Sequence, residues 1–379
     1  MKLWRRLMPL LVLLLAAACS GPNAGLPVTA TLPPPTGTRP PTATRPVTAT
    51  VLPSATIPPT ATAAPAVPTA PPVVDTTSTP DVAEAGAAGW QPMATLPVDF
   101  VYALSWAAGD QQLLFADELG VWAVGRDGSG RVQLFTAPSQ DERYEISPAG
   151  VLAQLLNQSV AQLYYLSSGQ PAQALTVGPA IGLALSPDGR TLAAASAERI
   201  AATLFDTVGD RPQRTLNGFE TAAPIYSIRF SDDGQTLIWL ARGTVQLMDV
   251  ASGQPGPRFE HEDFVGALAL ARDGGTLATA SYGTVNDNFG PVVTLWDTAG
   301  GPAISLPQAQ PVISLAFAPD GQLLALGMAD GTVQLLDVAT QQVVAVLNGD
   351  GSSMNFLAFS ADGQLLAAAG QALTLWQRP

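Results

Sequence analysis

The sequence is poor in the residues that most catalytic and metal sites need. It contains one cysteine, Cys19, one histidine, His261, and one lysine, Lys2. Nucleophilic catalysis by serine or cysteine needs a neighbouring base, and a zinc site needs three or four His, Cys or carboxylate ligands at suitable spacing. The sequence therefore predicts no catalytic residue, no metal site and no cofactor.

Charged residues are also scarce, at 12% of the chain against 47% for hydrophobic residues. This supply of apolar side chains is enough for a large core, which a disordered chain lacks. The net charge is −13, and the acidity lies beyond residue 89, because residues 1–89 carry five basic and three acidic side chains. An acidic domain repels phosphate backbones, so we expect no nucleic-acid binding.

The N-terminus has the order of an export signal. Basic residues from Lys2 to Arg6 precede an apolar run of about 12 residues, Leu7 to Ala18. A membrane-spanning helix needs roughly 20 apolar residues, so a stable transmembrane helix is the weaker interpretation.

The residues before Cys19 resemble the lipobox of bacterial lipoproteins, since Ala16, Ala17 and Ala18 are small. That family prefers leucine where Ala16 stands. The resemblance implies a signal peptide over residues 1–18, diacylation of the Cys19 thiol by fatty acids such as palmitate, and anchoring in the cell membrane facing outside the cytoplasm. An ordinary secretory signal is the alternative. Cys19 has no possible intramolecular disulfide partner, which favours lipidation.

Residues 19–89 form a second region that cannot build a core. Most prolines of the chain crowd between Pro22 and Pro80, where threonine is common and aromatic residues are missing. Proline fixes the backbone and removes hydrogen-bond donors, so we expect a disordered, extended stalk. Its threonines are compatible with O-linked sugars or with a bare spacer.

Beyond Trp90, short apolar runs broken by Gly, Asp and Pro predict an all-β domain over residues 90–379. The clearest unit runs from Ile313 to Ala325 and continues through Asp330 to Asp337. Its turn glycine recurs at Gly109, Gly150, Gly189, Gly234, Gly274, Gly321 and Gly363, at intervals of 41, 39, 45, 40, 47 and 42 residues. Each unit predicts a small antiparallel sheet with an open apolar face. Seven such sheets can cover these faces by stacking around an axis, which predicts a seven-bladed β-propeller.

The units resemble WD40 repeats. Leu295-Trp296-Asp297 keeps the signature dipeptide, and Asp206, Asp249 and Asp337 keep its aspartate. The Gly-His pair that opens family repeats survives only as Glu260-His261, so the buried His-Asp network of the family is mostly missing. The last unit stops after three strands, and Trp90 to Pro97 can supply the fourth. We expect a closed monomeric ring.

One segment exceeds what the repeat requires. Tyr282 to Pro291 is longer than the equivalent Met328 to Gly331, and in WD40 propellers such a loop shares a face with the connection between blades, here Phe259 to Phe264. The two would place aromatic anchors within an acidic rim, which suits a basic protein or peptide. The candidate partner-binding residues are Phe259, Glu260, His261, Glu262, Asp263, Tyr282, Asp287 and Phe289. A tolerated surface insertion, with a structural His261, is the alternative.

Two functions remain open at this point. The first is a membrane-anchored, extracytoplasmic WD40-repeat lipoprotein that serves as a protein-interaction platform. The second is a propeller enzyme or cofactor-binding protein, such as a hydrolase or a quinoprotein-like dehydrogenase, using axial carboxylates and arginines that sequence cannot place. The run Asn286-Asp287-Asn288 lacks the terminal glutamate of a calcium loop, so it does not favour a metal site.

Overall fold

The computed structural model describes residues 89–98, 100–136, 143–209, 212–217, 225–241 and 243–378. The predicted signal peptide, Cys19 and nearly all of the predicted stalk lie outside these residues. Within them, the regular secondary structure is β-strand, and no helix is available that could cross a membrane.

The strands form seven four-stranded antiparallel sheets, which we number as blades one to seven. Blade one contains β2 (Ala103–Trp106), β3 (Gln112–Asp117), β4 (Gly120–Gly125) and β5 (Val132–Thr136). Blade two contains β6 (Arg143–Ile146), β7 (Val151–Leu156), β8 (Val160–Tyr165) and β9 (Gln170–Thr176). Blade three contains β10 (Ala180–Leu185), β11 (Thr191–Ser196), β12 (Ala201–Asp206) and β13 (Pro212–Asn217). Blade four contains β14 (Ile225–Phe230), β15 (Thr236–Ala241), β16 (Thr244–Asp249) and β17 (Pro255–Glu260).

The remaining three blades follow the same order. Blade five contains β18 (Val265–Leu270), β19 (Thr276–Val285), β20 (Asn288–Asp297) and β21 (Ile304–Pro307). Blade six contains β22 (Val312–Phe317), β23 (Leu323–Met328), β24 (Thr332–Asp337) and β25 (Val343–Asn348). Blade seven contains β26 (Phe356–Phe359), β27 (Leu365–Ala369), β28 (Ala372–Gln377) and, from the start of the domain, β1 (Gln91–Pro97).

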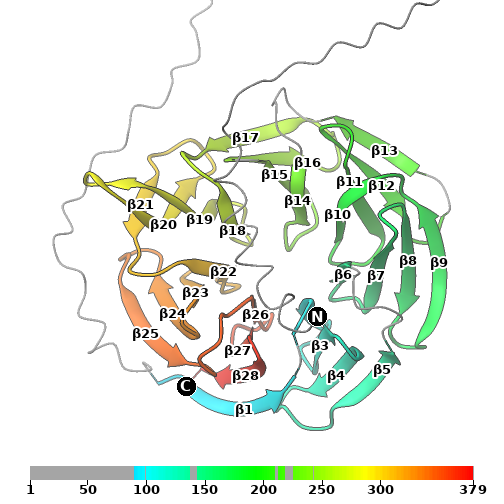
Figure 1. Cartoon of the computed structure of the whole chain (residues 1–379), viewed down its shortest axis with the longest axis horizontal. Helices are drawn as coiled ribbons and strands as arrows, with labels where there is room; N and C mark the ends of the chain where they lie inside the picture. The colour runs from blue at the N-terminus through cyan, green and yellow to red at the C-terminus, as the bar shows by residue number, and fades with distance from the viewer. Residues whose placement is uncertain are drawn as a thin grey trace, which may run out of the picture. The chain divides into compact units, whose positions relative to one another are not determined.

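The blades are arranged in a ring, with the first strand of each innermost and the fourth strand outermost (Figure 1). This confirms the predicted all-β, seven-bladed propeller. The ring is closed by β1, which pairs antiparallel with β28, so that Thr95 faces Thr374 and Pro97 faces Ala372. Hydrogen bonds between the two ends of the domain therefore hold the ring together.

In each blade a tight turn connects the first two strands. The seven turn glycines all have a positive φ, a conformation that side chains with a Cβ rarely adopt. In blade four the backbone N–H of Gly234 donates to the carbonyl of Ser231 at 2.9 Å, and the Ser231 hydroxyl donates to Asp233 at 2.6 Å. The aspartates that precede these glycines are thus turn residues.

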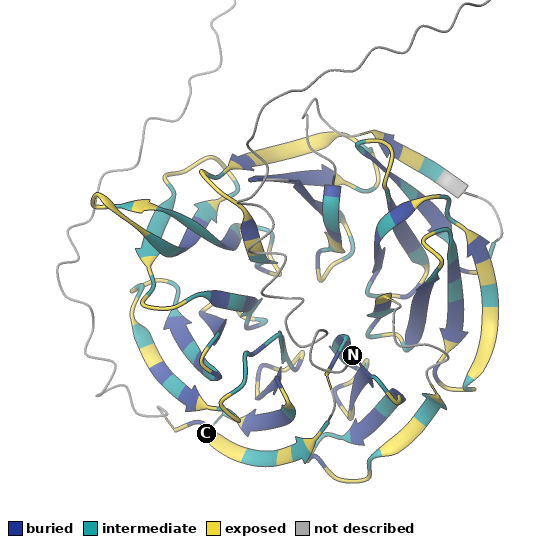
Figure 2. Cartoon of the chain, in the orientation of Figure 1, coloured by how far each residue is buried: buried dark blue, intermediate teal, exposed yellow. Residues whose placement is uncertain are grey.

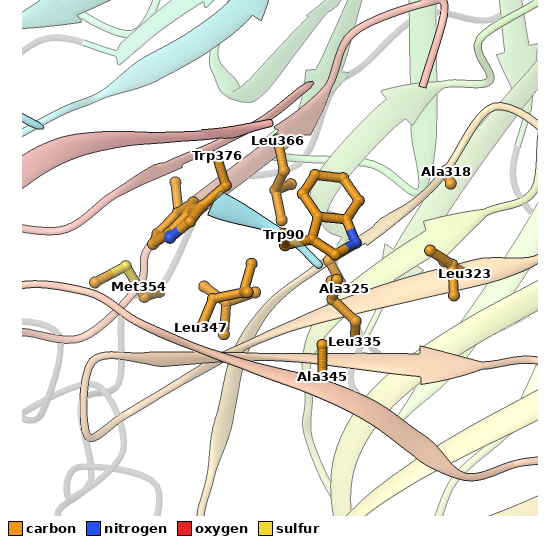
Figure 3. Close-up of a cluster of buried hydrophobic side chains, with 12 residues drawn as sticks. Trp90, Ala318, Leu323, Ala325, Leu335, Ala345, Leu347, Met354, Leu366 and Trp376 are labelled. Atoms are coloured by element: carbon orange, nitrogen blue, oxygen red, sulfur yellow. The ribbon is translucent and has the colours of Figure 1, made fainter. Parts of the chain in front are cut away.

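The core consists of hydrophobic clusters between neighbouring blades. Buried side chains concentrate on the second and third strands of each blade, and the outermost strands are largely exposed (Figure 2). The cluster between blades six and seven contains Leu335, Leu366 and Trp376, together with Trp90, the residue just before β1 (Figure 3). Trp90 packs edge-to-face on Phe359, with ring centroids 6.1 Å apart. The N-terminal strand therefore contributes both hydrogen bonds and a buried aromatic ring to the closure.

Candidate interaction surface and charged cavity

The segment expected as a long loop in blade five is an extension of the sheet. β19 and β20 continue pairing through Gly283 opposite Gly290 to Val285 opposite Asn288. Asn286 and Asp287 form the two-residue turn, with φ of 51° and 62°. Two consecutive residues with positive φ match the twist of a hairpin, which is why the strands continue here instead of ending in an irregular loop. The tip stands out from blade five at the upper left of Figure 1 and is exposed in Figure 2.

The extended hairpin lies against the connection between blades four and five. The backbone N–H of Thr284 donates to the carboxylate of Glu262 at 3.0 Å. This contact joins two segments that are 22 residues apart, and it also satisfies an N–H on the edge of the extension. Asp263 caps the start of the next strand by accepting from the Phe264 N–H at 2.7 Å.

Two aromatic rings lie together on the hairpin. Tyr282 and Phe289 stack with their centroids 6.1 Å apart and an interplanar angle of 27°. Phe289 is 64% exposed, which is unusual for so large an apolar side chain. We call the exposed residues Glu262, Asp263, Asp287 and Phe289, with the half-buried Tyr282 beneath them, the hairpin surface.

The structure corrects the expected exposure of Phe259. This ring is 7% exposed, lies in the core between blades four and five, and packs on Trp296 at 5.4 Å. Phe259 faces Val245 on β16, and side chains of a strand alternate between its two sides, so its neighbours Arg258 and Glu260 point outward instead. Glu260 forms an ion pair with Arg258 and accepts from the Thr244 hydroxyl at 2.6 Å, which ties it to blade four.

His261 is also held inside the blade. Its Nε2 lies 2.8 Å from the hydroxyl of Thr279, and its Nδ1 lies 3.3 Å from the carbonyl oxygen of Gly243. The indole N–H of Trp296 donates to the same Thr279 hydroxyl at 2.9 Å. Because the Gly243 carbonyl oxygen can only accept, a neutral His261 ring carries its proton on Nδ1 and accepts from the Thr279 hydroxyl at Nε2. The repeat with the intact Trp-Asp pair thus has a His-Thr-Trp hydrogen-bond network.

The surroundings of His261 favour this neutral form. Burial lowers the pKa of His261 to about 4, while the hydrogen bond to Gly243 and the charge of Glu260 act more weakly in the opposite direction. A histidine with so low a pKa is uncharged at neutral pH. Of the eight predicted partner-binding residues, Phe259 and His261 therefore serve the blade, and the partner-binding role of the others stays a prediction.

The structure also brings together charged residues that the sequence did not single out. Arg143 and Glu145 of β6 and Arg229 of β14 line one cavity of about 90 Å³ with residues of β10 and β14. The charge pattern becomes visible in the sequence only when the first strands of the units are aligned on their turn glycines. For metals, no group of three or more His, Cys, Asp or Glu side chains among the described residues has a suitable arrangement.

Comparisons with known proteins agree with this architecture. The sequence profile of the anaphase-promoting complex subunit 4 WD40 domain matches residues 296–362, from the end of β20 to the first turn of blade seven. The WD repeat-containing protein SL1-17 of Schistosoma mansoni is 32% identical over 157 residues, which are 41% of this chain and 49% of that protein.

Two further relatives match over shorter shares of their length. Transducin beta-like protein 3 of Bos taurus is 28% identical over 39% of this chain and 19% of its own length. Telomerase protein component 1 of Rattus norvegicus is 26% identical over 52% of this chain and 7% of its own. The chain thus spans at most about half the length of these curated relatives. The matches thus show that part of this chain is similar to WD40-repeat proteins, and its seven four-stranded blades form a β-propeller.

Proposed function

We propose that this chain is a lipoprotein that a lipid on Cys19 anchors to the cell membrane outside the cytoplasm, with its propeller acting as a non-catalytic protein-interaction platform. The Pro/Thr-rich segment is the stalk that sets the reach of the propeller. At about 3.1 Å per residue, a stalk of roughly 60 residues extends to at most about 180 Å.

The observation that carries the platform is the hairpin surface. A ring that is 64% exposed, supported by a stacked tyrosine, offers an anchor of the kind that dominates protein interfaces. Glu262, Asp263 and Asp287 surround it with negative charge and favour a partner segment that is basic. A hydrophobic centre with a polar rim is the common anatomy of such sites.

Site-specific photocrosslinking tests this surface. We expect a crosslinker at position 289, on the full chain in its native membrane, to give an adduct of one defined mass. The same crosslinker at Val208 is the control, because Val208 is 73% exposed and follows β12, at the opposite end of the strands from the β19–β20 turn. Added salt should lower the yield, because it weakens the attraction between exposed charges, with a Debye length of about 10 Å at 0.1 M. Equal yields at both positions would contradict the proposal.

A shortened hairpin provides the matched variant. Deleting Thr284, Val285, Asn288 and Phe289 removes two cross-strand pairs and keeps Asn286–Asp287 as the turn. Because side chains alternate with a period of two, the remaining residues keep their faces. We expect this variant to lose the crosslinked partner, detected through a second crosslinker at Asp263, while its thermal unfolding changes little. A partner retained at full yield would show that the hairpin is only a tolerated extension.

The lipid anchor has its own test. Cys19→Ser removes the only thiol of the chain, so no acyl chain can attach there. We expect the variant to move from the membrane fraction to the soluble fraction, because buried acyl chains contribute about 0.8 kcal/mol per methylene to anchoring. If the serine variant still required detergent for extraction, the lipobox interpretation would be wrong.

A further inference from the structure

The inner strands of the seven blades share one register, so their residues can be compared position by position. In each, the last residue of the strand faces the leucine at the second position of the second strand, as Phe317 faces Leu324 and Phe230 faces Leu237. The residue before it is small in five blades and charged in two. The small residues are Ser105, Ala184, Ala269, Ala316 and Ala358, and the charged ones are Glu145 in blade two and Arg229 in blade four.

A third charge lies two residues earlier on the inner strand of blade two. Arg143 precedes Glu145 by two positions, so both side chains leave the same side of β6. The equivalent residue in blade one is Ala103, and in blade three it is Gly182. At the two compared positions, the inner strand of blade three therefore has neither a charged nor a large side chain between the charged strands of blades two and four.

These three side chains meet at the cavity bounded by β6, β10 and β14. Its volume is about 90 Å³, and Gly182, Leu183, Tyr226, Ser227 and Ile228 complete its lining. A cavity of this size is roomy enough for a few waters or one small polar molecule. The Tyr226 hydroxyl is already engaged, because it donates to the Val265 carbonyl at 2.8 Å.

Two guanidinium groups at one cavity are unusual in a propeller with so large an excess of acidic side chains. Within the described part of the chain, no hydrogen bond or ion pair engages the side chains of Arg143, Glu145 or Arg229. Guanidinium donors match the oxygens of carboxylate, phosphate and sulfate groups in geometry and charge. We propose that this cavity binds a small oxyanion between Arg143 and Arg229.

Glu145 makes the site sensitive to pH. Burial raises the pKa of Glu145 to about 7, and the charge of Arg229 offsets part of that effect. The other titratable groups at the cavity are Arg143 and Tyr226, and β10 contributes none. As the pH falls through about 7, Glu145 becomes neutral, loses its repulsion of an anion and gains a proton that it can donate. Anion affinity therefore increases on acidification.

The test is calorimetric titration of the full-length protein with phosphate, sulfate and acetate at constant ionic strength. We expect saturable binding of at least one of the three, and the one bound most tightly distinguishes a tetrahedral from a planar oxyanion site. Affinity should be several-fold higher at pH 6 than at pH 8. No saturable binding of any of these anions at either pH would overturn the proposal.

The propeller supplies its own conservative variants. Arg229→Ala installs the residue that blades three, five, six and seven carry at this position, and Arg143→Ala installs that of blade one, so both should fold. We expect each to weaken binding at least tenfold. Arg190→Ala, in the exposed first turn of blade three, changes the net charge equally and should leave binding intact. If Arg229→Ala and Arg190→Ala weakened anion binding equally, only the overall charge of the protein would matter.

Glu145→Gln separates the role of the carboxyl group from that of the arginines. The amide is neutral at every pH, so this variant should bind the anion at pH 8 about as well as the wild type does at pH 6. A wild-type pH dependence that persists unchanged in Glu145→Gln would contradict the assigned role of Glu145.

Discussion

Blades five and one hold a tryptophan of their third strand in different ways. In blade five, Trp296 faces Leu277, donates its indole N–H to Thr279, and has the His261 ring edge-on at 5.1 Å. In blade one, the residue facing the corresponding leucine is Val124, and the indole belongs to Trp122, two residues closer to the turn. The ring has moved along the strand but remains on the same side of the sheet.

The partners of the two indoles differ in charge. Trp122 donates at 2.8 Å to Asp117, whose side chain is 0% exposed. Arg131 pairs with the same carboxylate at 3.1 Å and lies 4.0 Å from the centre of the Trp122 ring. Blade five therefore satisfies its indole with neutral groups, and blade one uses an ion pair stacked on the ring. The repeat position can diverge in sequence because either arrangement satisfies the buried N–H.

The largest effect should come from breaking the network of blade one. Asp117→Ala leaves the Arg131 charge without its carboxylate and frees three N–H donors, those of Leu119, Gly120 and the Trp122 indole. We expect a loss of about 3 kcal/mol in the free energy of unfolding, measured by chemical denaturation. Asp127→Ala is the control, because Asp127 is exposed and, among the residues the structure describes, its side chain accepts hydrogen bonds from Ser129. Similar losses in both variants would remove the distinction between the two blades.

A smaller effect is expected in blade five. Thr279→Val keeps the shape of the side chain but removes the hydroxyl shared by Trp296 and His261, which leaves two buried groups without a partner. We expect a loss of about 2 kcal/mol in the free energy of unfolding. Thr203→Val, on the exposed face of β12, should change little. The cost of Thr279→Val should shrink when Trp296→Phe is already present, and strict additivity would mean that no network exists.

The smallest effect is a pH dependence specific to blade five. The folded-state pKa of His261 is about 4, below the usual value of 6.5, so between these values the unfolded chain binds a proton that the folded chain does not. Stability should therefore fall as the pH drops from 6.5 toward 4, and at pH 5.5 His261→Gln should already have removed on the order of 1 kcal/mol of that fall. Since His261 is the only histidine, its NMR titration gives the pKa directly. A measured value near 6.5 would contradict a buried, neutral ring.

Much of the ring is visible in the sequence, because its signals are local. Each turn glycine marks a backbone conformation that other residues adopt at a cost, and the glycines recur once per blade. Trp90 to Pro97 is expected to supply a fourth strand because the last unit stops after three, and β1 does lie against β28. The repeat is harder to recognise in blade one, because Trp122, Asp117 and Arg131 occupy positions that the repeat pattern does not include.

The site residues were harder to predict because burial depends on neighbours from other strands. The spacing of Phe259 and His261 places both in the connection between blades, but it does not show which of them turns inward. The length of Tyr282 to Pro291 predicted an excess segment, whereas the two-residue turn at Asn286 and Asp287 decided that this segment is a hairpin.

The sequence by itself determined the strand order, the turns and the number of blades, because these follow from backbone preferences and from alternation of apolar residues within about 40 positions. Only the tertiary structure decided that Glu262 reaches Thr284, that Trp296 shares a hydroxyl with His261, and that Arg229 lines a cavity with Glu145. These contacts join separate strands, connections or blades. Their geometry is set when the sheets pack around the axis, and no local pattern encodes it.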